Sequence, residues 1–107
     1  MIKGEIVLAE FPYTDYTGSK LRPVLILAEK KNDVLGAFIT GNLEDSDEDD
    51  LLLEADNTNR LKKNSRLRLF RLATIKKSKI SGTIGFIDEK TLKLIDQKLM
   101  KILKISK

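Results

Sequence analysis

The chain has 107 residues, 20 basic and 16 acidic side chains, a net charge of +4, and neither cysteine nor histidine. Its length indicates a single domain over residues 1–107, and 41% hydrophobic with 34% charged residues is typical of a globular protein. The missing residue types exclude disulfides, thiolate or imidazole metal ligands, and cysteine or histidine catalysis. Any catalysis must use carboxylates, hydroxyls, lysine, arginine or backbone groups, and the positive charge favours a polyanionic or acidic partner.

The first half of the chain predicts three strands. They are short apolar runs at residues 4–11, 23–28 and 34–40. The second run is continuously apolar, as in a strand buried on both faces. Gly36 inside the third run indicates a bulge or a close backbone approach. The polar stretches between the runs predict a loop at residues 12–20 and a turn at residues 30–33.

The second half predicts three further strands and one helix. The strands are expected at residues 51–55, 65–72 and 79–87. In residues 65–72, Leu67 and Leu69 alternate with Arg66, Arg68 and Phe70, which is the pattern of a half-buried strand.

The helix is predicted after Asp88, whose carboxylate can accept hydrogen bonds from the first-turn amides. Apolar residues then recur at helical spacing, at Leu92, Ile95, Leu99, Ile102 and Leu103. We expect this face to pack on the sheet, docking of a partner being the alternative. Short strands followed by one terminal helix predict a small, strongly bent antiparallel barrel.

Charge is segregated along the chain. Six of the seven residues 44–50 are acidic, whereas residues 57–87 contain nine basic and no acidic side chains. The basic block is either a nucleic-acid surface or the partner of the acidic run. Asp45, Asp47 and Asp49 alternate as in a calcium loop, but Asp50 stands where that loop needs glycine. We therefore expect no metal site and no cofactor.

No apolar run reaches the roughly 7–15 residues of a secretory signal or the ~20 residues of a membrane span. The sequence therefore predicts a cytoplasmic protein without a membrane partner.

Several short motifs occur in a specific order. They are Gly4-Glu5-Ile6-Val7, the run at residues 11–15, Arg22-Pro23-Val24-Leu25-Ile26-Leu27, the run at residues 38–40, and Ser65-Arg66-Leu67-Arg68. Their order and spacing resemble those of the PemK/MazF family of toxin endoribonucleases over about the whole chain. The strand that begins Arg22-Pro23 after a Gly-Ser turn is the most specific of these motifs.

The resemblance implies an SH3-like barrel, usually homodimeric, that acts as a toxin of a type II toxin-antitoxin system. It implies metal-independent cleavage of single-stranded RNA, in which the ribose 2′-hydroxyl attacks its own 3′ phosphate and translation is inhibited. It also implies a small antitoxin whose disordered acidic and apolar segment wraps the toxin, and DNA binding together with that antitoxin.

The family's catalytic arginine and threonine match Arg22 and Thr40. A guanidinium offers two parallel donors to phosphate oxygens, and a threonine hydroxyl can donate or accept a hydrogen bond. The alternatives are a surface arginine at a strand start and a β-branched strand residue. For RNA binding the sequence nominates Tyr13, Lys20, Ser65, Arg66 and Arg68, since aromatic and basic groups together suit single-stranded RNA.

One position departs from the family pattern. Many members have an aspartate two residues after the arginine that matches Arg68, and this chain has Phe70. The general base is therefore not identified, with Glu5, Asp15 and Lys20 as candidates. Phe70 is either a core aromatic or a platform on which an unpaired base stacks. Two other functions remain open at this point: a gyrase poison of the CcdB type, and a non-cleaving barrel that binds RNA or peptide.

Overall fold

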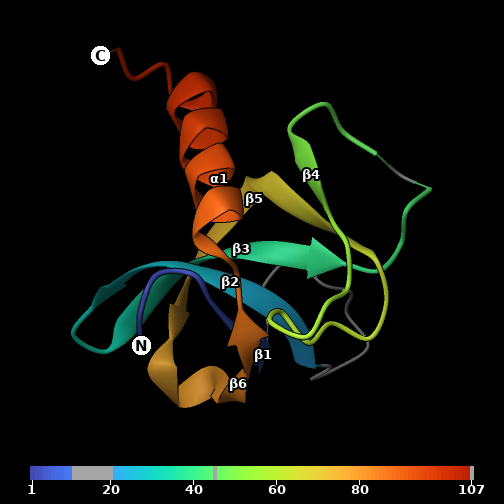
Figure 1. The fold of residues 1–107 in the computed structure, drawn as a ribbon. Coiled ribbons are helices and arrows are strands. Elements are labelled where there is room, and N and C mark those ends of the chain that lie inside the picture. Colours follow the sequence, from blue (N-terminus) through green and yellow to red (C-terminus); the bar gives the residue numbers. More distant parts are fainter. Residues whose placement is uncertain (11–20, 45, 107) are drawn as a thin grey trace.

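A computed structural model of the protein describes residues 1–10, 21–44 and 46–106, and Figure 1 shows its fold. The elements in chain order are β1 (Glu5–Glu10), β2 (Leu21–Lys30), β3 (Asp33–Thr40), β4 (Asp50–Leu53), β5 (Ser65–Lys76), the 3-10 turn η1 (Lys77–Lys79), β6 (Ile80–Phe86) and α1 (Glu89–Ile102). No helix in these described ranges is long and apolar enough to cross a membrane.

The described strands form one antiparallel sheet in the order β4-β5-β3-β2-β1-β6. The sheet bends strongly, and the loop after β4, one edge strand, descends toward β6, the other edge strand (Figure 1). This loop is hydrogen-bonded to β6, since the Phe86 amide of β6 donates to the Thr58 carbonyl of the loop over 2.9 Å. The prediction of a small, bent, mainly β barrel with a C-terminal helix is confirmed.

Apolar residues fill both faces of the sheet. One cluster contains Ile6, Leu25, Ile39, Leu67 and Leu69 and lies under α1. The other cluster is smaller and lies on the opposite face; it consists of Val7, Ala9, Val24, Ile26, Val34 and Ile75. Residues of both clusters alternate along the central strands, which explains why residues 24–27 are all buried.

The helix packs on the sheet as predicted. The Asp88 carboxylate accepts a hydrogen bond from the Thr91 amide over 2.7 Å and caps the first turn. Ile95 is fully buried, and Leu92, Leu99 and Ile102 pack against the larger cluster. The inclusion of Leu103 in this face was wrong: it is 57% exposed, because it lies at the C-cap beyond the last full turn.

Two backbone irregularities shape the sheet near its centre. Ala37 of β3 pairs with Leu72, but the next residue, Phe38, pairs with Arg68, so residues 69–71 of β5 have no partner in β3. Such insertions bend a strand. The strand also continues to Lys76, four residues past the predicted end. Gly36 is confirmed as a close approach, because a Cβ there would overlap the Val24 side chain of β2.

Candidate functional site

The strand register brings Arg22 and Thr40 together. Val24 of β2 pairs with Phe38 of β3, and the strands are antiparallel, so Arg22 lies level with Thr40 two residues further along. On the other side of β3, Thr40 pairs with Arg66 of β5. Side chains in such a row have Cβ atoms about 4.5–5.5 Å apart on neighbouring strands. Thr40 therefore stands between two arginines.

A cleft of about 790 Å³ opens at this end of the sheet. Of the residues nominated from sequence, Arg22, Thr40 and Ser65 line it. Its remaining described lining is apolar, basic or neutral: Leu8, Leu21, Pro23, Phe38, Gly41, Asn42, Arg60, Leu61, Lys62, Lys63 and Ile84. Because no described lining residue is acidic, the cleft suits a ligand with negative charge and some apolar surface.

Arg22 and Thr40 both retain hydrogen-bonding capacity. The Nε atoms of Arg22 and Arg66 are both buried and have no hydrogen-bond partner among the residues that the structure describes. That of Arg66 lies 3.7 Å from the Asp50 carboxylate, whereas Arg22 forms no ion pair with a described residue. Buried polar groups of this kind are uncommon in folded proteins and are often found where a ligand binds. The Thr40 hydroxyl oxygen accepts from the Asn42 amide over 3.1 Å, which leaves its proton available for donation.

Ser65, Arg66 and Arg68 have roles within the fold. The Ser65 hydroxyl is buried and donates to the Lys63 carbonyl over 2.9 Å. Arg66 donates from Nη2 to the Leu43 carbonyl over 2.7 Å. Arg66 and Arg68 are not among the residues that line the cleft. Tyr13 and Lys20, the other two residues nominated for RNA binding, lie outside the described residues.

Asp50 lies between the two arginines of β5. Its carboxylate oxygens are 3.7 Å from Nε of Arg66 and 3.5 Å from Nε of Arg68. The Asp50 side chain is only 3% exposed, and it also accepts from the Asp47 amide over 3.0 Å. The last residue of the acidic run therefore pairs with two arginines of the basic block. This agrees with the alternative in which the basic block is the partner of the acidic run.

The rest of the basic block divides into three groups. Arg71 and Lys76 are exposed residues of β5 outside the cleft lining. Lys77 pairs with Glu29, and Lys79 lies 3.6 Å from a Glu10 carboxylate oxygen. In contrast, Arg60, Lys62 and Lys63 line the cleft and form no ion pair within the described part of the chain. Sequence reasoning did not single out these three residues. The available sequence signal was that all three lie in the stretch without acidic residues, 57–87. That signal did not distinguish them from the basic residues of the same stretch that pair with carboxylates.

Glu5, a candidate general base, lies away from the cleft. Its carboxylate accepts from the Ile2 amide over 3.1 Å and from the Thr83 hydroxyl. It begins β1, whereas Arg22 pairs with Ala9 near the end of that strand. Asp15 and Lys20 lie outside the described residues. Within the described ranges, no group of three acidic, histidine or cysteine side chains could hold a metal ion.

Phe70 does not belong to the core, so that alternative was wrong. Its side chain is 60% exposed, because it lies on the other face of β5 from the buried Leu67 and Leu69. It is not among the residues that line the cleft.

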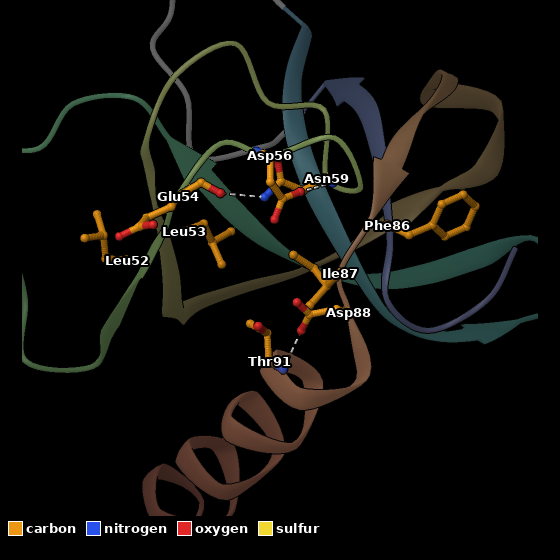
Figure 2. A pocket seen from close by; sticks show the side chains of 9 residues that line it. All are labelled: Leu52, Leu53, Glu54, Asp56, Asn59, Phe86, Ile87, Asp88 and Thr91. Carbon is orange, nitrogen blue, oxygen red and sulfur yellow. Dashed lines mark hydrogen bonds between the residues drawn. The ribbon is translucent and has the colours of Figure 1, made fainter.

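A second pocket of about 300 Å³ lies beside the first turn of α1 and contrasts with the cleft (Figure 2). Its polar groups hold the fold: Asp56 accepts from the Thr58 and Asn59 amides over 2.9 and 2.7 Å. Asn59 in turn donates from its side chain to the Glu54 carbonyl over 2.8 Å. Hydrogen bonds from the Thr91 side chain and backbone hold the pKa of Asp88 below its usual 3.8. With Glu54, Asp56 and Asp88 in its lining, this pocket does not suit a polyanion.

Comparisons with known proteins identify a family and a shared fold. Residues 2–103 match the family described as PemK-like, MazF-like toxins of type II toxin-antitoxin systems. The comparison with curated proteins found no match. Two similar solved structures are an endoribonuclease in complex with its cognate antitoxin from mycobacterial species and the Mycobacterium tuberculosis toxin MazF-mt6.

The structural likeness extends over the whole fold. The mycobacterial endoribonuclease has a TM-score of 0.76 at 14% identity, and the match covers 100% of this chain and 98% of that one. The MazF-mt6 toxin has a TM-score of 0.76 at 19% identity, with 96% of this chain and 99% of that one covered. At such identities the likeness establishes a shared fold.

Proposed function

Since the chain belongs to the PemK-like, MazF-like family of type II toxin-antitoxin toxins, we propose that it is an endoribonuclease that cleaves single-stranded RNA. The observation that carries this proposal is the cleft in which Arg22, with an unpartnered buried Nε, lies level with the Thr40 hydroxyl. The similar mycobacterial endoribonuclease and MazF toxin support the same activity.

The proposed reaction uses the ribose 2′-hydroxyl of the RNA as the nucleophile. The 2′-hydroxyl loses its proton as its oxygen bonds to the adjacent phosphorus, the bond from phosphorus to the 5′-oxygen breaks, and the departing 5′-oxygen takes up a proton. The products carry a 2′,3′-cyclic phosphate and a 5′-hydroxyl. Arg22 binds the phosphate oxygens and stabilises the charge that builds on them. The Thr40 hydroxyl donates to a phosphate oxygen or orients the 2′-hydroxyl. The protein thus supplies positioning and charge stabilisation for a nucleophile that RNA itself carries.

We propose that a small antitoxin covers this cleft. We also propose that the toxin is a homodimer, that each chain forms one domain, and that it acts in the cytoplasm. The antitoxin of the similar mycobacterial endoribonuclease supports the existence of such a partner. An acidic and apolar segment fits the cleft because the described lining combines Arg22, Arg60, Lys62 and Lys63 with apolar side chains.

The test is a cleavage assay on a long single-stranded RNA in EDTA with mapping of the fragment ends. We expect discrete cuts with the cyclic phosphate and 5′-hydroxyl ends described above. Arg22→Ala should lower the rate by about 10²–10³-fold, the usual effect of removing one preorganised donor. Arg71→Ala is the matched control, because Arg71 is an exposed arginine of β5 outside the cleft lining.

Two results would contradict the proposal. Folded wild-type protein that makes no cuts would remove the nuclease function and favour a protein target or a binding barrel. Full activity in Arg22→Ala would place the active site elsewhere on the molecule.

A further inference from the structure

We propose that Lys63 is a second phosphate-binding cation of the Arg22–Thr40 site, placed there because Gly41 has no side chain. This inference rests on the proposed function, since it takes the phosphodiester of RNA as the ligand. Sequence reasoning did not nominate Lys63. It nominated Ser65, Arg66 and Arg68 of the motif that follows, and these have roles within the fold.

The geometry begins at Gly41, the residue directly after Thr40. A Cβ atom at Gly41 would overlap Cε of Lys63 and would lie 3.2 Å from its Nζ atom. The Lys63 stem therefore packs on the Gly41 backbone, in the space that any other residue would fill. Its ammonium group therefore lies beside Gly41, the residue that follows Thr40, and Lys63 and Thr40 both line the cleft.

The loop that carries Lys63 is fixed at several points. The Lys63 carbonyl accepts from the Ser65 hydroxyl over 2.9 Å, and the Asn64 side chain accepts from the Ala55 amide over 2.9 Å. Further back, buried Asn59 accepts from the Leu61 amide over 3.0 Å. A lysine on a pinned loop loses less conformational freedom when it binds than one on a mobile segment.

Within the described part of the chain, no carboxylate neutralises the charge of Lys63. Lys63 forms no ion pair with any residue that the structure describes, whereas Lys3, Lys77 and Lys79 each lie beside a carboxylate. Arg22 lies on β2 and Lys63 in the loop that leads into β5, so the two cations flank β3, which carries Thr40, from opposite sides. A phosphate bound at Thr40 would therefore meet a guanidinium fork and an ammonium point charge, both of which favour its charged oxygens.

The experiment removes the ammonium group in two independent ways. Lys63→Met removes the charge and keeps an apolar stem. Gly41→Ala keeps the charge but places a methyl group where the Lys63 stem lies, and circular dichroism verifies that this variant folds. Lys63→Arg retains the charge. Lys76→Met is the matched control, because Lys76 is an exposed lysine at the opposite end of β5.

Binding is measured first, to a 2′-O-methyl RNA that cannot be cleaved, over a series of salt concentrations. Each phosphate contact on a single strand contributes about 0.7 to the slope of log affinity against log salt. We expect Lys63→Met to lose about that amount, Gly41→Ala to change in the same direction, and Lys63→Arg and Lys76→Met to keep the wild-type slope. Single-turnover cleavage should fall about 10- to 100-fold in Lys63→Met, the range for a lost hydrogen bond to a charged group.

The two assays separate this inference from the function on which it rests. Wild-type protein that binds the RNA but does not cleave it overturns the nuclease proposal alone, and the salt slopes still decide the role of Lys63. Equal slopes for wild type and Lys63→Met overturn the inference even when wild type cleaves. Wild-type protein that does not bind the RNA overturns both.

Discussion

The hydroxyl of Thr40 has one hydrogen bond in the fold and one proton left to donate, and substitutions can separate these roles. Thr40→Val keeps the shape and removes the hydroxyl, whereas Thr40→Ser keeps the hydroxyl. We expect Thr40→Val to lower the cleavage rate about 10²-fold or more. It should lower the free energy of unfolding by only about 0.5–1.5 kcal/mol, the usual net value of one hydrogen bond. Thr40→Ser should retain most of the activity.

The comparison of rate with stability is the decisive measurement for Thr40. Cleavage is followed under single-turnover conditions, and stability by urea unfolding of the same preparations. If Thr40→Val cleaved at the wild-type rate, Thr40 would be a strand residue whose hydroxyl serves only the Asn42 amide.

Asp50 illustrates a different kind of residue, a carboxylate that holds two arginines. Removing one partner from a largely buried ion pair leaves the other charges uncompensated. We expect Asp50→Asn to lower the free energy of unfolding by about 1–3 kcal/mol, the cost of leaving buried groups unsatisfied. Urea unfolding measures the change. The control is Glu48→Gln in the same acidic run, where the side chain is exposed; equal stability of the two variants would contradict the pairing of Asp50 with Arg66 and Arg68.

Among the elements, β6 meets the loop after β4 through Gly85. A Cβ atom there would lie 2.5 Å from the Asn59 carbonyl oxygen and 2.6 Å from that of Thr58. Gly85→Ala should therefore force the loop away from the strand and lower the free energy of unfolding by about 1–3 kcal/mol. Gly82→Ala, in the same strand, is the matched control, since a Cβ there meets nothing within 4 Å. Thermal and urea unfolding of both variants test this, and equal stability would contradict the close packing of the loop on β6.

Sequence periodicity predicted the elements well wherever local chemistry decided the structure. The alternation around Leu67 and Leu69 predicted a half-buried strand, and Asp88 predicted the start of the helix. The β5 strand was predicted too short because its residues 69–71 leave the register of β3, and such an insertion depends on the partner strand. Phe70 lies on the surface, on the other face of the strand from the buried Leu67 and Leu69.

In the cleft, too, residues marked by a sequence motif were predicted, and a residue placed by a contact between distant parts of the chain was missed. The motif around Arg22 and Thr40 nominated two residues that the register brings level. Lys63 was missed, because its place beside Thr40 depends on a contact across 22 positions of the sequence with Gly41. For Asp50 the sequence left open whether the acidic run pairs with the basic block. The pairing depends on β4, which begins at Asp50 beside the strand that carries Arg66 and Arg68.

For the molecule as a whole, acid should weaken the fold over a narrow pH range. Lys77 and the N-terminal ammonium group hold the pKa of Glu29 below its usual 4.5, and Thr91 holds that of Asp88 below 3.8. A lowered pKa in the folded state means that the unfolded chain takes up protons first as the pH falls. The stability from these groups is therefore complete above about pH 4.5 and is lost as the pH falls through their folded pKa values.

The Glu29→Gln variant tests this origin of acid sensitivity. At neutral pH it should be less stable than wild type, because Met1 and Lys77 lose their common carboxylate partner. The difference should shrink as the pH falls, since wild type then loses the same interactions. Urea unfolding between about pH 2.5 and 7 gives both curves.

The control is Glu44→Gln, an exposed carboxylate without an ion pair among the described residues. A Glu29→Gln curve that ran parallel to wild type would show that Glu29 stabilises the fold by contacts that do not depend on its charge. The chain has no histidine, so no histidine titration can alter either curve between about pH 5 and 7.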